Sequence, residues 1–456
     1  MRPGKTSAER GLGLVPLIWR PAAVVSKALE SSKSLRRRAP DSCNIRGMRQ
    51  YGYARTSDRL GRYYTNSAIS QCLIDLIDDA APSAVVDLGS GQGALSVAAS
   101  SRWRDAALAT VDVDDVAANV LVGRLRESGF CGGHFHVAAD ALSVDLPERI
   151  HDAIGSAPNL AVCNPPFFVP VWQRDFLSIA EDAGLSDCLP PPANTDAACL
   201  FLAQNLRLVS DGGTVAIIVP DSLASASKYQ SLRRSLMRRF DLQHSIKLPA
   251  MSFSGTEARA HIMIVKKSSM TSETVRLSSL NSLTGAIQSV DVSLAAACER
   301  LDIDFHRQRI GPGSGLTLGD IAIDVRRGSF SSAQVRNSPG LILHTTDIVD
   351  GMTGQWIDLS SENNSISFES GTWVEPGDLI VARVGRNASS KVVGVSSGRM
   401  PISDCLFRIR VPKVRQRQLL KMLSSVEGRM WIEANSHGVA ARHISKSGLL
   451  NFPLER

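Results

Sequence analysis

The sequence predicts an α/β protein: a Rossmann-like parallel sheet in the first part of the chain, followed by a second, α+β domain. The chain has 456 residues, which is too long for one hydrophobic core and suggests two or three domains. Up to about residue 275, apolar runs of strand length end at acidic or polar residues, as is typical of open parallel sheets. Beyond residue 315, shorter apolar runs are broken by Gly-Asp turns, which indicates a different fold.

A glycine-rich turn follows the first apolar run. Residues 85–88 are Val-Val-Asp-Leu, and Gly89, Gly91 and Gly93 come before the start of a helix. This order brings backbone close to a bound ligand. The spacing differs from the Gly-x-Gly-x-x-Gly of dinucleotide enzymes. With Asp87 opening the turn, it suits a ligand with a cationic amino acid end better than a pyrophosphate.

Two further apolar runs also end at acids. Residues 107–111 end at Asp112, whose carboxylate is placed to accept two hydrogen bonds from a ribose. Residues 135–139 end at Asp140, which is placed to accept from an adenine amine. One acid at such a position is more often a helix N-cap or a turn residue. Three acids that close three successive strands favour a nucleoside site.

The most informative motif is Asn164-Pro165-Pro166-Phe167, directly after the apolar residues 160–163. An exocyclic amine is a poor nucleophile because its lone pair is delocalised into the ring, so a catalyst must hold its N–H groups with acceptors. The Asn164 amide oxygen and the Pro165 carbonyl supply two acceptors, and consecutive prolines stiffen the turn. Phe167 offers an apolar face for a base taken out of its stack. The turn therefore predicts methyl transfer to an exocyclic amine.

These motifs resemble, in order, the S-adenosylmethionine-dependent DNA adenine-N6 methyltransferases of the gamma arrangement, particularly the modification subunits of type I restriction systems. The resemblance implies a Rossmann-like methyltransferase domain over residues 51–275, with S-adenosyl-L-methionine as cofactor. It implies that the cofactor lies along the strand ends, on Asp87, Gly89, Gly91, Asp112, Asp140 and Asn164.

An upstream element supports the resemblance. Residues 61–66 are similar to the family's Gly-x-Tyr-Tyr-Thr-Pro element, which contacts the methionine end of the cofactor. Tyr64 and Thr65 are therefore expected to bind the cofactor. Asn66 replaces the usual proline, so the helix that begins nearby loses its preset φ, although Thr65 or Asn66 can still cap it.

A downstream element, residues 248–253, resembles the family segment whose aromatic packs on the flipped adenine. The resemblance implies that Phe253 and Phe167 stack on the target base. Phe253 is equally compatible with a core position before the predicted strand 261–265.

The C-terminal part differs in character. Residues 276–315 are rich in Ser and Thr and end in Gly-Pro-Gly-Ser-Gly, which predicts a linker. A helical stretch is predicted at 418–435, and short strands at 316–321, 344–348 and 374–383. This pattern resembles one target-recognition domain of the type I specificity subunits, which would cover residues 316–456.

Basic residues in or beside loops of that domain are the expected DNA contacts: Arg326, Arg327, Arg383, Arg386 and Lys391. Charge runs are more often solvated faces. Arg383 and Arg386, however, flank Gly385 in a turn after a strand, where contact with a phosphate or a guanine is favoured.

The net charge of +7 is uneven, because residues 1–50 hold 11 Lys and Arg against 3 Asp and Glu. This segment has no sustained periodicity and is predicted to be a flexible basic arm, or an extension upstream of a functional start near Met48. Its composition also fits an organelle transit peptide. The eight cysteines form no Cys-x-x-Cys pair, which favours reduced thiols in a cytoplasmic protein. His134 and His136 have no Cys or acidic partner at ligand spacing, so no metal site is predicted. No apolar run approaches the roughly 20 residues that span a bilayer.

The sequence thus predicts a site-specific DNA adenine-N6 methyltransferase, acting on double-stranded DNA within a restriction-modification or phage-defence system. A separate restriction nuclease or a second copy of the chain are further expected partners. Cytosine N4 is the main alternative target, since its amine presents the same problem. RNA, protein glutamine and a catalytically silent DNA-binding regulator are weaker alternatives.

Overall fold

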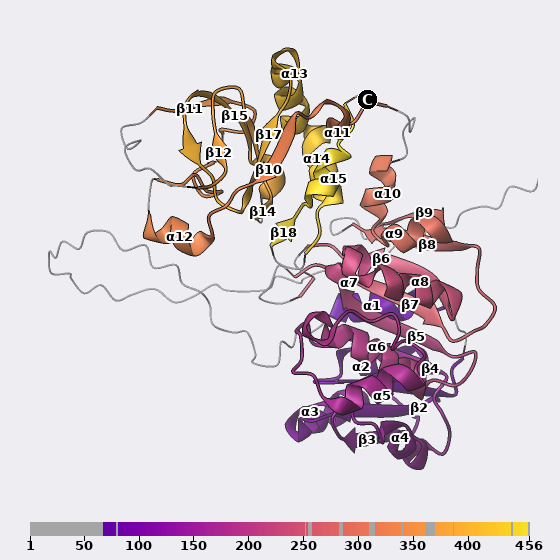
Figure 1. Cartoon of the computed structure of the whole chain (residues 1–456). Helices are drawn as coiled ribbons and strands as arrows, with labels where there is room; N and C mark the ends of the chain where they lie inside the picture. The colour runs from indigo at the N-terminus through magenta and orange to yellow at the C-terminus, as the bar shows by residue number, and fades with distance from the viewer. Residues whose placement is uncertain are drawn as a thin grey trace, which may run out of the picture.

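The computed structural model describes residues 67–78, 81–250, 252–253, 258–281, 286–309, 315–338, 341–349, 351–360, 370–385, 387–438 and 441–454. The predicted basic arm and the predicted site residues Tyr64, Thr65 and Arg386 lie outside the described residues. Two parts are visible, one built on a nine-stranded sheet and one on a five-stranded sheet (Figure 1). We call the first the catalytic domain, after the activity that the sequence predicts for it, and the second the C-terminal domain. The predicted fold class, α/β with a second α+β domain, is confirmed.

The nine-stranded sheet has the order β3-β2-β1-β4-β5-β7-β6-β8-β9. Its first five members in this order are parallel, whereas β7 is antiparallel to both of its neighbours and β9 is antiparallel to β8. Strands β1, β4 and β5 are buried along their whole length because helices cover both faces of the sheet. The strands are β1 (Ala84–Leu88), β2 (Ala107–Asp112), β3 (His134–Ala138), β4 (Leu160–Cys163), β5 (Thr214–Pro220), β6 (Asp241–Lys247), β7 (Ala260–Lys266), β8 (Thr274–Leu280) and β9 (Ile287–Ser293).

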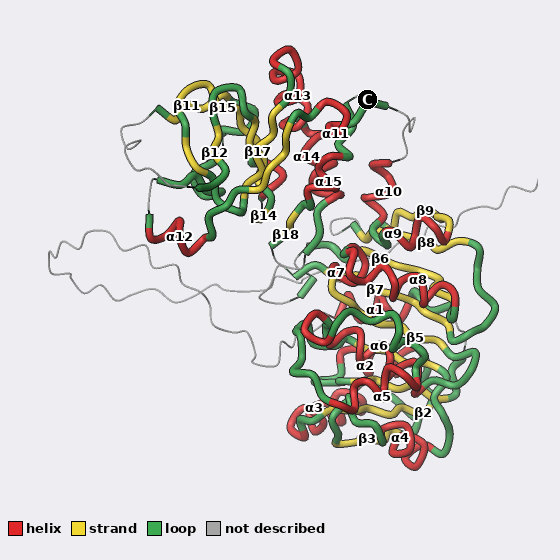
Figure 2. Tube along the Cα trace, in the orientation of Figure 1, coloured by secondary structure: helices red, strands yellow, loops and turns green. Residues whose placement is uncertain are grey.

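Two apolar cores lie on the two faces of this sheet. One face packs on α1 (Ser67–Asp75), α2 (Ala94–Arg102) and α3 (Asp115–Glu127). The other packs on α4 (Leu146–Ile154), α5 (Arg174–Asp182), α6 (Ala197–Leu208), α7 (Asp221–Ser225), α8 (Gln230–Arg238) and α9 (Leu294–Glu299). Helix α10 (Ile303–Arg309) then leads towards the C-terminal domain. Figure 2 shows this alternation of helices and strands along the chain.

The structure redraws the predicted linker 276–315. Most of β8 and all of β9 lie within that stretch, and they extend the catalytic sheet at its far edge. Residues 294–309 then form the two short helices α9 and α10. The Ser- and Thr-rich composition misled the prediction, because a strand at the edge of a sheet tolerates polar residues on its exposed face.

The C-terminal domain is built on a sheet of order β10-β17-β13-β15-β11. One face of this sheet packs on α11, α13, α14 and α15, and its other face supports a smaller apolar cluster. The helices are α11 (Leu318–Ile321), α12 (Ser332–Asn337), α13 (Lys413–Ser424), α14 (Val426–Asn435) and α15 (Lys446–Leu450). The strands are β10 (Asp324–Arg327), β11 (Trp356–Leu359), β12 (Trp373–Val374), β13 (Leu379–Ala382), β14 (Val384–Gly385), β15 (Val392–Gly398), β16 (Met400–Pro401), β17 (Leu406–Arg410) and β18 (Arg442–His443).

Two of the short strands predicted here are wrong. Residues 316–321 contain helix α11, because Thr317 and Asp320 form a capping box that starts a helical turn. Residues 344–348 form a turn in which the Asp347 carboxylate accepts from the His344 backbone N–H at 2.7 Å. The third prediction, 374–383, contains β13 between the ends of β12 and β14.

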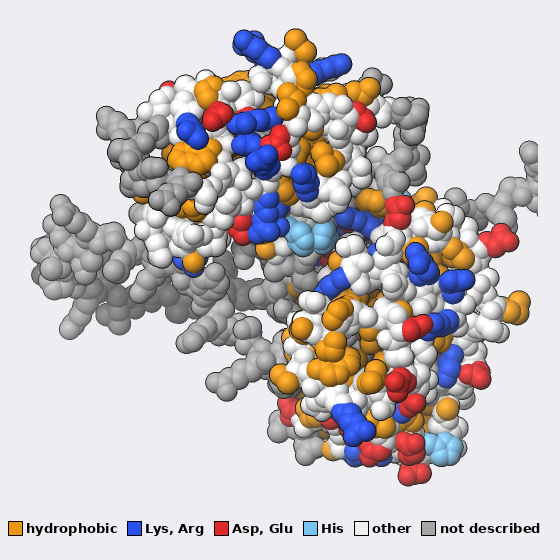
Figure 3. Space-filling view, viewed as in Figure 1, with side chains coloured by type: hydrophobic (Ala, Val, Ile, Leu, Met, Phe, Trp, Pro, Cys, Tyr) orange, Lys and Arg blue, Asp and Glu red, His pale blue; other side chains and the backbone are white. Residues whose placement is uncertain are grey.

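The C-terminal domain lies beyond the β6 to β9 end of the catalytic sheet, far from β3 (Figure 1). On the face shown in Figure 3, Lys and Arg side chains run across the C-terminal domain towards the junction with the catalytic domain.

Candidate active site

Four polar side chains follow four adjacent strands of the catalytic sheet. Asp140, Asp112, Asp87 and Asn164 lie at or just after the carboxyl ends of β3, β2, β1 and β4. Because these strands are neighbours and parallel, their carboxyl ends meet at one edge, where open α/β sheets bind ligands.

A cavity of about 470 Å³ lies at this edge. All four of these side chains line it, together with Gly89 and Gly91 of the glycine-rich turn. The remaining lining is mainly apolar: Ala94, Leu95, Val113, Ala139, Ala141, Leu142, Pro166, Phe168, Pro170, Val171, Phe176 and Phe201, with Ser67, Ser90, Gln92, Arg124 and Gln173. The structure therefore brings the predicted cofactor residues within the described part of the chain into one cavity.

Asp87 is the most buried acid of the group, with 1% of its surface exposed. Burial raises the pKa of its carboxyl to about 7, although the Ser96 hydroxyl, which donates to it at 2.6 Å, opposes the shift. A ligand cation placed beside Asp87 would favour the ionised carboxylate. The site is therefore suited to an ammonium group.

Asp112 and Asp140 shape the loops beside them. One oxygen of Asp112 accepts from the Gly91 backbone N–H at 2.7 Å, and the other accepts from the Asp114 N–H at 2.9 Å. Asp112 thus holds the glycine-rich turn against β2. The Asp140 carboxylate accepts from the Leu142 N–H at 2.9 Å and remains exposed. Each carboxylate retains further lone pairs for a ligand.

The Asn-Pro-Pro-Phe turn has two sides. Asn164 and Pro166 line the cavity, whereas Phe167 packs on the core cluster that contains Phe253. The two rings meet edge to face, with centroids 6.0 Å apart and planes at 78°. Phe253 is only 1% exposed, so in this conformation it is a core residue, which is one of the two positions expected from the sequence. A base stacked between the rings requires them to separate.

Sequence reasoning missed the apolar lining of the cavity. Val113 follows Asp112 directly and is 61% exposed, and Val171, beyond the Asn-Pro-Pro-Phe turn, is 88% exposed. Large apolar side chains left exposed beside a ligand cavity are themselves a functional signal. The available sequence signal was an apolar residue immediately after a strand-end acid, at Val113 and at Ala141.

Four of the basic residues predicted to contact DNA are among the described residues, and each of the four has a partner within the chain. Arg326 forms an ion pair with Asp324 at 3.0 Å, and Arg327 forms one with Asp404 at 2.6 Å. Arg383 donates to the Asp404 carbonyl at 2.7 Å. The Lys391 ammonium donates to the Thr345 carbonyl. Arg327 and Arg383 thus meet at Asp404, while Arg326 points elsewhere.

One ring nitrogen of His134 and one of His136 contact the Thr110 hydroxyl, at 2.9 and 3.0 Å. The described residues contain one group of three close potential metal ligands, the buried Asp221, His261 and Asp302. The Lys247 ammonium lies 3.0 and 2.9 Å from the two carboxylate oxygens of Asp302, so a cation already occupies that position.

No helix among the described residues is both long and apolar enough to cross a membrane.

Two family models match the catalytic domain. Residues 136–290 match the N-6 DNA methylases, and residues 67–179 match the methyltransferase small domain. Methyltransferases of these families use S-adenosyl-L-methionine as methyl donor. No curated protein matches the chain.

Solved structures of restriction-modification proteins are similar to parts of the chain. The methyltransferase subunit of a type I system from Streptococcus thermophilus is 19% identical, with a TM-score of 0.41, and the match covers 53% of each chain. The type IIG restriction endonuclease BpuSI is 14% identical, with a TM-score of 0.46, over 85% of this chain and 57% of its own. The M protein of the type I enzyme EcoKI is 14% identical, with a TM-score of 0.38, over 62% and 61%.

In each case the match spans less than two thirds of the length of the solved structure. The family models, the sheet order and the strand-end cavity agree with one another. The region from Ser67 to Val290 therefore has a methyltransferase fold, and within it residues 136–290 match the N-6 DNA methylases.

Proposed function

We propose that this chain is a site-specific DNA methyltransferase that transfers the methyl group of S-adenosyl-L-methionine to N6 of an adenine flipped out of duplex DNA. The observation that carries the proposal is the convergence of Asp140, Asp112, Asp87 and Asn164 on one cavity at the ends of four adjacent strands. The match to the N-6 DNA methylases supports adenine as the target.

The residues around the cavity fit this cofactor. Asp87 is buried and suits the cationic amino acid end, Asp112 suits the ribose hydroxyls, and Asp140 suits the adenine amine. Val113 and Leu142 offer apolar surface for the adenine ring. The volume, about 470 Å³, lies within the range of ordinary ligand sites. When bound, the cofactor supplies a methyl group activated on a sulfonium.

The catalytic turn acts on the target amine. The two N–H groups of the amine donate hydrogen bonds to the Asn164 amide oxygen and the Pro165 carbonyl. These hydrogen bonds draw the amine nitrogen towards tetrahedral geometry. Pro165 and Pro166 fix φ, so these acceptors need not be rearranged during the reaction. Phe167 stacks on the flipped base once its contact with Phe253 opens. The methylated amine then loses its extra proton to water.

The C-terminal domain is the proposed target-recognition module, and Arg326, Arg327, Arg383, Arg386 and Lys391 are its proposed DNA contacts. Exposed ion pairs stabilise a protein by only about 0 to 1 kcal/mol. Arg326 and Arg327, which are both exposed, therefore exchange their acidic partners for a DNA phosphate at little cost. The proposed setting is a restriction-modification or phage-defence system, with a nuclease on another chain or a second copy of this one as further partners.

The test is methylation-sensitive long-read sequencing of DNA from a host that expresses the chain. Modified adenine at one short sequence is expected for the wild-type protein, and its loss is expected for Asn164→Ala. Removal of one preorganised acceptor typically slows transfer about 100-fold or more. The binding affinity for S-adenosylmethionine, measured by calorimetry, should stay largely intact.

Asn159→Ala is the matched control. Asn159 precedes the opposite end of the same strand, β4, and its side chain accepts from the Ala84 N–H at 3.1 Å. This variant should retain methylation. Modified cytosine in place of adenine would move the target to N4, and normal methylation by Asn164→Ala would remove the mechanism.

A further inference from the structure

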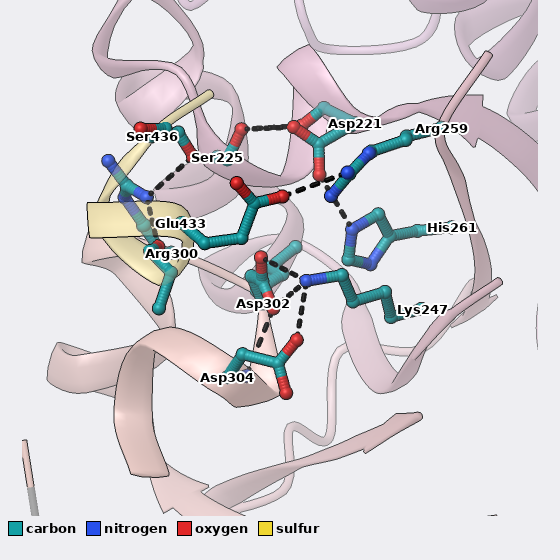
Figure 4. Close-up of polar contacts among 12 residues, drawn as sticks. Asp221, Ser225, Lys247, Arg259, His261, Arg300, Asp302, Asp304, Glu433 and Ser436 are labelled. Atoms are coloured by element: carbon teal, nitrogen blue, oxygen red, sulfur yellow. Dashed lines mark hydrogen bonds and ion pairs between the residues drawn. The ribbon is translucent and has the colours of Figure 1, made fainter. Parts of the chain in front are cut away.

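A partly buried polar cluster joins the two domains (Figure 4). The catalytic domain contributes Asp221, Lys247, Arg259 and His261, and the C-terminal domain contributes Glu433, Ser436 and Arg442. The segment between α9 and α10 contributes Arg300 and Asp302. We call these residues the junction cluster. It lies outside the cofactor cavity, and the proposed chemistry does not use it.

Arg300 makes the most extensive contact across this junction. Its guanidinium donates to the Ala434 carbonyl at 2.9 Å and to the Asn435 carbonyl at 3.0 Å. A longer contact, 3.4 Å, reaches the Ser436 carbonyl. These carbonyls end helix α14, where the backbone lacks helical donors and carries partial negative charge. Arg300 therefore caps a helix of the other domain.

Arg300 is itself held in place. Its guanidinium lies 4.7 Å from the centre of the Phe305 ring, a cation–π contact within the same segment. The next residue, Leu301, donates its N–H to the Ala224 carbonyl at 2.9 Å and accepts from the Ser245 hydroxyl at 3.1 Å. Asp302 binds the Lys247 ammonium. The segment that carries Arg300 is thus fastened to the catalytic domain before it reaches α14.

Two further contacts join the same surfaces. Glu433, on the last turn of α14, pairs with Arg259 of the catalytic domain at 2.8 Å and with Arg442 of its own domain at 2.9 Å. The Gly438 N–H approaches the fully buried Asp221 carboxylate at 3.4 Å. Across the junction, Glu433 and Arg259 thus pair through their side chains, whereas the side chains of Arg300 and Asp221 contact backbone groups of the C-terminal domain.

The junction lies at the same sheet edge as the candidate active site. Asp221 directly follows Pro220, the last residue of β5. Strand β5 is the parallel neighbour of β4, which ends one residue before Asn164. The C-terminal domain is therefore attached at the edge where the flipped base must arrive.

We propose that Arg300 is a positioning residue: by capping α14, it fixes the C-terminal domain relative to the carboxyl edge of the catalytic sheet. This inference rests on the proposed function, because the consequence of losing it is a misplaced target base. A displacement of about 1 Å at the reacting atoms costs up to about 100-fold in rate. Loss of the cap should thus slow methyl transfer more than it weakens binding of either ligand.

The test compares full-length Arg300→Ala with Arg276→Ala. Arg276 is an exposed arginine paired with Asp291 on the neighbouring strand of the catalytic sheet, at 3.0 Å, and it makes a matched control. Small-angle X-ray scattering should give Arg300→Ala a larger radius of gyration than the wild type. Its kcat on saturating duplex DNA should fall about tenfold or more. Dissociation constants for S-adenosylmethionine and duplex DNA should stay within about twofold, and Arg276→Ala should match the wild type throughout.

Two conservative variants sharpen the test. Arg300→Lys keeps the charge but loses the planar fork that reaches several carbonyls at once, so it should restore only part of the rate. Glu433→Gln keeps the side-chain volume and an acceptor for Arg442 but removes the charge opposite Arg259. Because the Arg259 and Glu433 side chains are 29% and 34% exposed, a two- to fivefold loss of kcat is expected.

Each outcome decides the inference. Wild-type scattering for Arg300→Ala would show that another contact holds the domains, and an expanded particle with wild-type kcat would reduce the cap to a stabilising role; either result overturns the proposal. An Arg300→Ala variant that no longer binds S-adenosylmethionine is misfolded, and the two conservative variants then decide. The proposal is overturned if Arg300→Lys and Glu433→Gln both have the scattering and the kcat of the wild type. A wild-type chain that methylates no duplex DNA would remove the proposed function, while scattering would still decide whether Arg300 holds the junction.

Discussion

The two domains place their candidate functional groups in different ways. In the catalytic domain, four side chains lie at the ends of adjacent parallel strands and converge on one cavity. In the C-terminal domain, the basic candidates lie on or beside a mainly antiparallel sheet. The candidates described there contact acidic side chains or backbone carbonyls: Arg326, Arg327, Arg383 and Lys391.

This difference shows that position in the fold carries more functional information than residue type. Parallel order brings carboxyl ends together whatever the helices between them, so a strand-end acid is expected near a ligand. A basic residue on an antiparallel sheet has no such constraint. Arg408 and Arg410 are close together in the sequence, yet each forms an ion pair within the domain. Asp324 pairs with Arg408, and Asp378 pairs with Arg410.

Removal of the C-terminal domain should have the largest effect, because it should separate cofactor binding from DNA binding. The apolar cores of the two domains share no residue, so a chain that ends at Ser314 should keep its affinity for S-adenosylmethionine. Its affinity for duplex DNA that contains the target sequence should fall at least about 100-fold, because specific contacts typically increase affinity 1,000-fold or more over non-specific binding. Fluorescence anisotropy over a salt series measures this. The intact chain should show a slope of roughly −0.9 per phosphate contact.

A truncated chain that methylated the same DNA sequence would place specificity in the catalytic domain. The C-terminal domain would then lose its proposed role, and its basic residues would be a solvated face.

The strand-end acids make the comparison sharper. Asp112→Ala should weaken S-adenosylmethionine binding by about 100-fold or more, because it removes two ribose hydrogen bonds to a charged group, which contribute roughly 1.5 to 3 kcal/mol each. It also removes the acceptor of the Gly91 N–H. Asp105→Ala is the matched control, since Asp105 is an exposed acid just before the opposite end of β2. Calorimetry should find the control unchanged, and equal affinities for the two variants would move the ribose site elsewhere.

The smallest effect concerns the protonation of Asp87. Since its pKa is raised to about 7, the carboxyl is mostly neutral at pH 5.5 and half ionised at pH 7.0 in the ligand-free protein. A free α-amino group, with a pKa near 7.7 to 8.0, stays charged over this range. S-adenosylmethionine should therefore bind about tenfold more tightly at pH 7.0 than at pH 5.5.

Calorimetry in buffers of different ionisation enthalpy checks this prediction, because binding at pH 6 should release a proton. Asp87→Asn should bind weakly and with little dependence on pH. If the affinity of the wild-type protein did not change over the range, the cationic end of the cofactor would not lie beside Asp87.

Much of the catalytic domain could be predicted from sequence because its signals are local. The run 160–163 coincides with β4, and the other strands predicted before it differ from β1, β2 and β3 by at most one residue at each end. Apolar residues buried on both faces leave a continuous run, and the polar residue that ends the run marks the edge of the sheet. The roles of Asn164, Asp87, Asp112 and Asp140 follow from that position and remain predictions, as does the role of Phe253.

Where local signals were weak, prediction failed. Polar residues concealed β9 because it lies at the edge of the sheet. Residues 316–321 were predicted to be a strand but contain helix α11, which the capping box at Thr317 starts. A short apolar run does not distinguish a strand from a helical turn, so a few side-chain hydrogen bonds decide between them.

The sequence by itself determined the strands β1 to β4, the glycine-rich turn and the polar residues that end these strands, because each depends on neighbouring residues. Only the tertiary structure decided which distant groups meet. Arg327 pairs with an acid 77 residues away, and Arg300 caps a helix that ends 135 residues beyond it. Periodicity states which face of an element is buried, but it does not specify the partner. Contacts at such separations are selected by the packing of whole domains, and the junction that carries Arg300 emerges only there.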